Sequence, residues 1–260
     1  MQVSGNTVLI TGGASGIGLA LAERFVKAGS TVIVCGRREG KLQEAKERLP
    51  GLHTRVCDVA NEKERQALVE WVAEAFPNLN VLVNNAGIQQ HIHLASAHEA
   101  WSRYQQEIAI NLEAPIHLTL LLLPHLLRQQ QPAIVNISSG LAVTPAVWAP
   151  IYSATKAGLR SFTISLRMQT EGSGLQVIEV LPPAVNTDLG GPGLHTFGAP
   201  VDAFADSVFA QLEEGRIEIG YGGTEERLNA TKAEIEAAVR AMWQGFLGRN
   251  PDFQKTTKSS

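Results

Sequence analysis

Cysteine and net charge are both low in this chain of 260 residues. Its two cysteines, Cys35 and Cys57, cannot form a disulfide framework and are typical of buried thiols in a reducing compartment. The formal net charge is −3, and no cluster of lysine and arginine offers the basic face that nucleic-acid phosphates require. We therefore expect no nucleic-acid partner.

Long apolar runs are absent as well. The longest, "LTLLLLPHLL" from Leu118, is too short to cross a bilayer and contains Pro124 and His125. The first strand-like run begins at Thr7, which leaves no room for a signal peptide ahead of it. These absences predict a cytoplasmic protein that has no membrane partner.

What the sequence does contain is a regular alternation of short β-branched runs and amphipathic stretches. Stretches such as "GLALAERFVKAG" carry apolar residues at helical spacing, whereas the runs between them are continuously apolar, as in strands buried on both faces. The pattern predicts an α/β fold: a single doubly wound Rossmann domain, with a central parallel sheet of about seven strands and helices on both faces. The clearest strand candidates are 7–11, 31–35, 53–57, 80–84, 133–138 and 175–181.

The spacing of these elements is even and shows no internal linker. Residues 1–250 are therefore predicted to form one domain, and residues 251–260 a flexible tail. Between 224 and 247 the apolar residues fall on one helical stripe. Such a stripe fits packing on the same domain, which we favour slightly, or a contact between subunits. Its members are Leu228, Ile235, Val239, Trp243 and Phe246.

A glycine-rich segment, "TGGASGIG", follows the first strand candidate and opens the first helical stretch. Gly12, Gly16 and Gly18 allow a tight turn that brings backbone N–H groups and a helix N-terminus up to a pyrophosphate. The spacing is neither the G-x-G-x-x-G fingerprint nor a P-loop, and many strand–helix turns use glycine only for positive φ. Its position after the first buried strand favours a dinucleotide.

The end of the second strand indicates which dinucleotide is bound. An acidic residue there would bind the ribose 2′-hydroxyl of NAD, whereas arginine accommodates the 2′-phosphate of NADP. Arg37 and Arg38 precede the first acid, Glu39, so we predict that NADP(H) is favoured over NAD(H). Solvated residues at a helix start are the alternative. Asp58, after the third strand, could accept a hydrogen bond from adenine, cap the helix that starts near Asn61, or do both.

Five segments share the order and spacing of one known family: "TGGASGIG", "NNAG" at 84–87, Asn111, "NISS" at 136–139 and "YSATK" at 152–156. Over about residues 5–190 the chain resembles the short-chain dehydrogenase/reductase family, and its wider sequence resembles the DltE-like subgroup. The resemblance implies an NAD(P)-dependent oxidoreductase acting on a small carbonyl compound or alcohol. The cofactor site is expected to consist of Gly12, Ser15, Gly16, Ile17, Gly18, Arg37, Arg38, Asp58, Val59, Asn85, Ala86, Gly87, Tyr152, Lys156, Pro182, Val185 and Thr187.

Tyr152 and Lys156 lie four residues apart, so on a helix they share one face. An adjacent ammonium and a positively charged nicotinamide both favour tyrosinate and would lower the pKa of Tyr152 from its reference value of about 10. A lowered pKa is what acid–base catalysis at neutral pH needs. The resemblance assigns Tyr152 as proton donor to the carbonyl oxygen, and Lys156 as the residue that binds the nicotinamide ribose and tunes Tyr152.

Two further catalytic residues follow from the same resemblance. Ser139 ends the fifth strand candidate and can donate to the substrate oxygen; Ser138 competes, but the family's spacing to Tyr152 favours Ser139. Asn111 lies in a helical stretch where asparagine is not favoured. In the family this residue distorts the helix and holds a water that relays protons to Lys156, although an exposed asparagine is an alternative.

The chain departs from the family pattern in two places. In "PPAVNT" Pro183 replaces a glycine, which fixes φ near −65° and removes a hydrogen-bond donor. After "RIEIGYGG" the chain continues into a helix where many relatives end, so their tetramer contact is not assumed. We still expect a homo-oligomer, either a dimer or a tetramer.

Substrate specificity is expected to come from "QQHIHLAS", "TPAVWAP" and "LGGPGLHTFG". Trp148, Leu189, Leu194 and Phe197 could form an apolar wall, and the glycines of the third loop would let it close over the site. The histidines of these loops have no metal-ligand spacing, so we predict no metal. They are His91, His93 and His195.

The preferred hypothesis is therefore an NADP(H)-dependent reductase or dehydrogenase. A dinucleotide-binding regulator that kept the fold without the chemistry is the main alternative, and the loss of Tyr152, Lys156 or Ser139 would have favoured it. An epimerase or dehydratase would use the same tyrosine and lysine. Such enzymes usually have another glycine spacing and a longer substrate domain.

Overall fold

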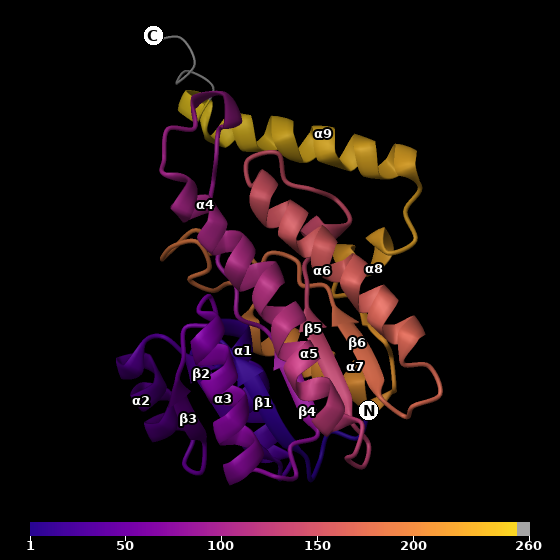
Figure 1. Ribbon diagram of the computed structural model, residues 1–260. Coiled ribbons are helices and arrows are strands. Elements are labelled where there is room, and N and C mark those ends of the chain that lie inside the picture. Colours follow the sequence, from indigo (N-terminus) through magenta and orange to yellow (C-terminus); the bar gives the residue numbers. More distant parts are fainter. Residues whose placement is uncertain (254–260) are drawn as a thin grey trace.

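The computed structural model describes residues 1–253; residues 254–260, most of the expected tail, lie outside the described part. A single sheet runs through the described chain and is covered by helices on both sides (Figure 1). Its strand order is β3-β2-β1-β4-β5-β6-β7, and neighbouring strands are paired in parallel. The predicted seven-stranded parallel sheet is therefore confirmed.

The strands lie close to their predicted positions. Central strands are buried on both faces, as expected from their continuous apolar runs, but the edge strand β3 exposes most of its side chains. The bounds are β1 (Thr7–Thr11), β2 (Thr31–Gly36), β3 (His53–Val56), β4 (Val81–Asn84), β5 (Ala133–Ile137), β6 (Gln176–Val180) and β7 (Glu218–Ile219).

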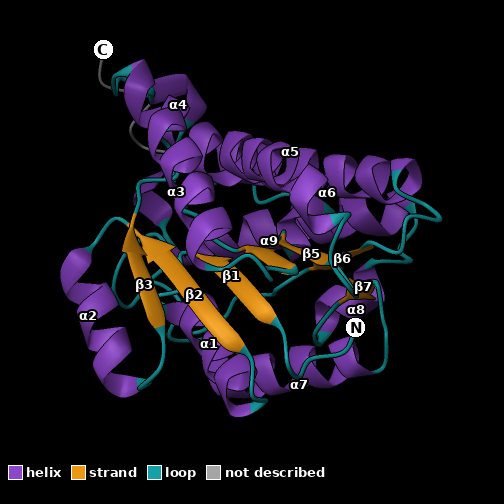
Figure 2. Ribbon diagram, turned by 60° about the horizontal axis from the view of Figure 1, so that its bottom comes forward, coloured by secondary structure: helices purple, strands orange, loops and turns teal. Residues whose placement is uncertain are grey.

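Two layers of helices enclose the sheet (Figure 2). One face packs on α1 (Gly16–Lys27), α2 (Glu39–Arg48) and α7 (Val201–Glu213). The other face packs on α3 (Glu62–Ala75), α5 (Ala114–Leu126) and α6 (Pro150–Gln169). Helices on both faces of a parallel sheet are the doubly wound arrangement predicted from the sequence.

The helix that carries Asn111 is interrupted. It begins as α4 (Trp101–Ile108), passes through a π-helical turn at Ala109–Glu113, and continues as α5. A π turn inserts an extra residue and re-aims the side chains around it, and such turns are frequent at functional sites. The distortion at Asn111 that the family resemblance implied is present.

The same helix is relevant to the membrane expectation. By length and composition alone, Trp101–Leu126 could cross a membrane, because α4, the π turn and α5 join into one long segment. In the fold it is a core helix. Leu118, Leu122 and Leu126 are buried in the cluster that covers one face of the sheet. Packing within the domain therefore explains the buried side of this helix, whereas Leu120 on its other side is exposed.

The C-terminal segment differs from the single helix expected over 224–247. It forms two helices, α8 (Gly223–Arg227) and α9 (Lys232–Arg249). Thr231 starts α9 with a capping box, in which its side chain accepts from the Glu234 backbone and the Glu234 carboxylate accepts in return. Leu228 consequently falls between the helices and off the stripe.

Three residues of the expected tail, 251–253, belong to the described part of the chain. They form a short helical turn, and the Phe253 ring packs edge-on against Phe246 of α9 at 5.0 Å. Helix α9 lies across the top of the molecule in Figure 1, above the ends of α4 and α6. The Phe246 ring of α9 is buried and stacks on Trp148 at 4.5 Å, so the helix contacts its own domain, as the favoured interpretation of the stripe expects.

Candidate active site

The predicted site residues lie at the carboxyl ends of the central strands. Strand order reverses at β1, which has β2 on one side and β4 on the other. In open α/β sheets, ligands bind in the crevice outside the carboxyl ends at such a switch point. The loops after β1, β4, β5 and β6 carry the glycine-rich segment, Asn85, Ser139 and Pro182 respectively.

The glycine-rich turn has a shape that only glycine tolerates. Gly12 has φ +65°, and a Cβ placed on it would lie 2.8 Å from the Ala86 Cα. A Cβ on Gly18 would lie 2.4 Å from the Asn85 side-chain nitrogen. The turn leads directly into α1, so backbone N–H groups at the start of that helix remain available for an anion. These features fit the pyrophosphate of a dinucleotide.

Ser15 and Arg38 extend this anion site toward the second strand. Ser15 is the N-cap of α1, but its side chain makes no capping hydrogen bond within the described residues. Its hydroxyl oxygen instead accepts from the Arg38 guanidinium at 3.2 Å. Arg37 and Arg38 are both exposed, so neither guanidinium is committed to the core. Ile17, also expected in this site, is half-buried against the core.

Asp58 does not cap the following helix, which is one of the two roles suggested for it. The N-cap of α3 is Asn61, whose side chain accepts from the Lys63 backbone at 3.0 Å. Asp58 accepts instead from the Ala60 backbone at 3.0 Å, which leaves its other carboxylate oxygen available. Val59 is buried beside it. Asn61 is the N-cap because it immediately precedes the first residue of α3, Glu62.

The "NNAG" segment is tied to the first strand by a residue that the sequence reasoning missed. The Thr11 hydroxyl accepts from the Asn85 and Ala86 backbone N–H groups at 3.0 and 3.1 Å. The Asn85 side chain donates back to the Thr11 carbonyl at 2.9 Å. Thr11 ends β1 within the glycine-rich motif, and only the fold shows that it faces β4. Gly87 follows and lies beside both Asn111 and Lys156.

The loop after β6 keeps an ordered shape despite Pro183. The Pro182 carbonyl accepts from the Gly140 backbone at 2.9 Å, and buried Val185 forms a bridge with Ala199. Thr187 reaches the glycine-rich turn, because a Cβ on Gly16 would lie 3.3 Å from its methyl group. The loop therefore closes the far side of the same crevice.

Asn111 is fully buried, which excludes the exposed alternative. Its side chain makes two hydrogen bonds with the backbone of Ile88: the amide oxygen accepts from the N–H at 2.9 Å, and the amide nitrogen donates to the carbonyl at 2.9 Å. It also donates to the Thr155 hydroxyl at 3.2 Å. Asn111 thus joins the π turn to the loop after β4 and to α6, which carries Tyr152 and Lys156.

The two adjacent serines have different environments. The Ser138 hydroxyl donates to the buried Glu179 carboxylate at 2.6 Å, so it belongs to the core. Ser139 is the residue that begins the next turn, where its oxygen accepts from the Leu141 backbone at 3.1 Å. That leaves the Ser139 proton free to be donated elsewhere. The geometry supports the preference for Ser139.

Tyr152 and Lys156 are buried in the first half of α6. The Lys156 ammonium donates to the Ile137 carbonyl at 2.8 Å and lies 5.7 Å from the centroid of the Tyr152 ring. Burial lowers the pKa of Lys156 to about 8, an effect that Glu107 opposes. At neutral pH most of the lysine is still charged.

The expected lowering of the Tyr152 pKa is not produced by the chain itself. Burial raises the pKa of Tyr152 to about 12; interaction with Ser139 opposes this rise, and the Glu107 carboxylate adds to it. The expectation was wrong in direction for the protein groups alone, because it considered the ammonium and omitted the cost of burying a phenolate.

Aromatic side chains lie beside Tyr152, where the sequence predicts part of the wall of a substrate site. Trp148 stacks on Phe246 of α9 at 4.5 Å, and His91 meets the same ring edge-on at 5.8 Å. Trp148 and Leu189 also pack on the small cluster that contains Tyr152. Phe197 does not join this wall, since it is 77% exposed, and Leu194 is also exposed. The sequence did not indicate that α9 would supply part of the wall.

Two of the three loop histidines, His93 and His195, have polar partners. His195 Nε2 lies 3.2 Å from the Gln89 side-chain oxygen, and His93 Nδ1 lies 3.0 Å from the Ser96 hydroxyl. The pKa of His91 is lowered by burial and by His195 nearby. Two of the three histidines therefore meet across loops that are distant in the sequence.

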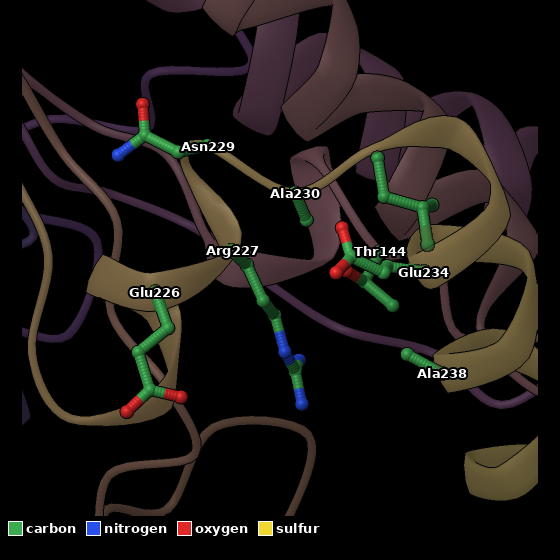
Figure 3. Close-up of a pocket in the computed structure, with 8 residues that line it drawn as sticks. Thr144, Glu226, Arg227, Asn229, Ala230, Glu234 and Ala238 are labelled. Carbon is green, nitrogen blue, oxygen red and sulfur yellow. The ribbon is translucent and has the colours of Figure 1, made fainter.

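A separate pocket of about 320 Å³ lies where α8 and α9 meet the loop after β5 (Figure 3). Thr144, Arg227 and Glu234 are among its lining residues. Thr144 is buried, and its hydroxyl has no hydrogen-bond partner among the described residues. The pocket adjoins the Ser139 turn, since Thr224 of α8 packs against Gly140.

Comparison with known proteins agrees with this geometry. The family model described as short chain dehydrogenase matches residues 6–194. The chain is 44% identical to the uncharacterized oxidoreductase DltE of Bacillus subtilis (strain 168), over 93% of this chain and 98% of that protein. It is 34% identical to sulfoacetaldehyde reductase 2 of Chromohalobacter salexigens, over 92% of this chain and 96% of the relative.

A solved structure is similar as well. L-Sorbose reductase of Gluconobacter frateurii, in complex with NADPH and L-sorbose, superposes with a TM-score of 0.67 at 32% identity. The match covers 72% of each chain. Since the family model spans well over half of the sequence and the DltE match nearly all of it, the chain belongs to the short-chain dehydrogenase family, as an NAD(P)-dependent oxidoreductase of the DltE-like subgroup.

Proposed function

We propose that the protein is an NADP(H)-dependent oxidoreductase that transfers hydride between the nicotinamide and a carbonyl compound or secondary alcohol, with Tyr152 as general acid and base. The observation that carries this proposal is the gathering of Ser139, Tyr152, Lys156 and Asn111, all buried, beside the loop that passes Gly87. A nucleotide-binding regulator has no need of this arrangement, so the enzyme is favoured over it.

In the reduction, the chain's residues hold the carbonyl oxygen and supply its proton. When bound, NADPH supplies the hydride that adds to the carbonyl carbon. The Ser139 hydroxyl donates a hydrogen bond to the oxygen as negative charge develops on it. Tyr152, a neutral phenol at physiological pH in this environment, transfers its proton to the same oxygen. Lys156 stabilises the resulting tyrosinate through its positive charge.

Oxidation runs through the same groups in reverse and needs tyrosinate at the start. The chain alone holds the pKa of Tyr152 at about 12, so a positively charged nicotinamide would have to lower it. Reduction needs no such change. We therefore propose that reduction is the easier direction at neutral pH.

The preference for NADP(H) rests on the Ser15–Arg38 contact. It directs a guanidinium to the rim of the pyrophosphate site, where the 2′-phosphate of NADP would lie. No acidic side chain ends β2 to repel that phosphate. The NADPH bound by the related L-sorbose reductase supports the same preference.

We further propose a cytoplasmic homo-oligomer. The outer surfaces of α5 and α6 expose large apolar side chains, which monomeric proteins seldom gather on neighbouring helices. The residues concerned are Leu120, Leu127, Ile164 and Met168. Sedimentation of the purified protein should give a dimer or tetramer, and a monomer at micromolar concentration would contradict the proposal.

The experiment that tests the function is a panel of aldehydes, ketones and secondary alcohols assayed with both cofactors. Oxidation of NADPH by at least one carbonyl compound, with conversion to the alcohol shown by product analysis, would support the proposal. If the protein binds NADPH but turns over nothing in a broad panel, the regulator becomes the better account. Inversion or dehydration without net change in the cofactor would instead indicate an epimerase or dehydratase.

A further inference from the structure

Glu107 is a buried acid that the proposed reaction does not use. It lies on α4, one helical turn before Asn111, and its side chain is fully buried. Acidic residues are almost never fully buried unless paired, because removing a carboxylate from water is costly. The position of Glu107 next to the catalytic residues therefore calls for an explanation.

The two carboxylate oxygens of Glu107 have different surroundings. Oε1 accepts from the Gln90 backbone N–H at 3.1 Å, in the loop that follows β4. Oε2 is buried and has no hydrogen-bond partner among the described residues. A purely structural glutamate would be expected to satisfy both oxygens. One oxygen is thus left to interact with a neighbouring charge.

The neighbouring charge is the Lys156 ammonium. Helix α4 packs against α6, and a Cβ on Gly87 would lie 3.4 Å from the Asn111 side-chain oxygen and 3.7 Å from Lys156 Nζ. Lys156 therefore lies near Asn111, which follows Glu107 by one helical turn. Among the described residues, only one of its three N–H donors has a hydrogen-bond partner, the Ile137 carbonyl.

The other charged groups near Glu107 are few. Tyr152, also on α6, becomes negative when ionised and opposes the Glu107 charge. Arg103, one turn earlier on α4, is engaged by Glu99 at 3.0 Å and by the Gln90 side chain at 3.1 Å. His91 follows Gln90 in the loop and has a pKa lowered by burial. Lys156 is the cation that acts on Glu107.

We propose that Glu107 is a positioning residue of the catalytic centre, whose buried negative charge keeps Lys156 in the ammonium form that Tyr152 requires. The proposal rests on the proposed function in one respect, since Lys156 must serve the acid–base step. Glu107 would then be a fifth residue of the centre, after Ser139, Tyr152, Lys156 and Asn111. It would act through Lys156 and would not touch the substrate.

The effects on the two groups are reciprocal, as electrostatic coupling demands. Ionised Glu107 raises the pKa of Lys156, and charged Lys156 lowers the pKa of Glu107. Burial is the larger effect on both, so the pKa of Glu107 is about 7 and that of Lys156 about 8. Without Glu107, Lys156 would lose its proton closer to neutral pH and with it the charge that stabilises tyrosinate.

Nuclear magnetic resonance can test the coupling without any substrate. The protein is labelled with ¹³C at lysine Cε and glutamate Cδ, and the signals of Lys156 and Glu107 are assigned from Lys156→Arg and Glu107→Gln. In Glu107→Gln the titration midpoint of Lys156 should fall by about one pH unit or more. Glu74→Gln, which removes an exposed glutamate on α3, is the matched control and should leave the midpoint in place.

The wild-type protein decides the question if Glu107→Gln does not fold. Glu107 should titrate well above an ordinary glutamate, and each signal should show a second inflection at the midpoint of the other group. An unchanged Lys156 midpoint in a folded Glu107→Gln variant, or a Glu107 that titrates as an exposed glutamate does, would overturn the proposal. Coupled titrations in a protein that turns over no carbonyl would overturn the proposed function alone.

Discussion

Arg38 donates a hydrogen bond to the Ser15 hydroxyl oxygen at 3.2 Å, which connects the end of β2 to the N-terminus of α1. An exposed arginine held at the rim of an anion site is well placed to bind the additional phosphate of NADP. Its contact with Ser15 shows that the side chain already reaches this rim.

Replacement of Arg38 by alanine should therefore weaken the binding of NADPH while leaving NADH almost unchanged. A charge-assisted hydrogen bond contributes roughly 1.5–3 kcal/mol, so the Kd for NADPH should rise about tenfold or more. Calorimetric titration with both cofactors measures the difference. Lys41→Ala, at an exposed position of α2 where the lysine pairs with Glu44, is the control. An equal loss of NADH and NADPH affinity would refute the assigned role.

Substitution of the adjacent serines should separate stability from catalysis. Ser138→Ala removes a hydrogen bond to the buried Glu179, so the free energy of unfolding should fall by about 1–3 kcal/mol. Ser139→Ala removes the hydrogen bond from the Leu141 backbone and should lower the free energy of unfolding by only about 1 kcal/mol, but it should lower kcat by about 10²–10³-fold because it removes a donor to the substrate oxygen. Urea unfolding and steady-state kinetics give the two quantities. If Ser138→Ala lowered kcat and Ser139→Ala mainly lowered stability, Ser138 and not Ser139 would be the catalytic serine.

Glu107 should make the protein less stable as the pH rises from acidic to neutral. The folded state holds its carboxyl group with a pKa of about 7, whereas the reference value is 4.5. Below both values the group is protonated in both states and has no effect. Between them the unfolded chain releases the proton first, so the free energy of unfolding falls with rising pH and the loss is complete above about pH 7.

The variant Glu107→Gln should escape this loss while keeping the hydrogen bond from the Gln90 backbone. From pH 4.5 to pH 8 the free energy of unfolding of this variant, relative to that of wild type, should rise by on the order of 2–3 kcal/mol. Urea unfolding of both proteins at the two pH values measures the gain. Parallel pH dependences would mean that Glu107 titrates normally and is not buried as a charge.

The strands and the motif positions could be predicted because their signals are local. Buried parallel strands are continuously apolar, and the glycines, Asn111, Ser139, Tyr152 and Lys156 occur at fixed spacing. The break between α8 and α9 also had a local signal, since Thr231 and Glu234 have the spacing of a capping box. The apolar stripe across the break obscured it.

Other features could not be read from the sequence because they depend on tertiary contacts. Glu107 occurs in a polar stretch of α4, and only the fold shows that its side chain is buried and not exposed to solvent. The direction of the Tyr152 pKa follows from how deeply α6 is buried, which no spacing reveals. The packing of α9 on Trp148 is likewise a contact between segments distant in the chain.

The central claim is that Tyr152 transfers the proton, and the variant Tyr152→Phe tests it most directly. With a carbonyl substrate found in the panel, the rate of NADPH oxidation should fall by about 10²–10⁴-fold while the Kd for NADPH stays nearly constant. Tyr221→Phe, which removes a hydroxyl from a ring packed on Phe204, should retain wild-type turnover. Wild-type turnover in Tyr152→Phe would contradict the account.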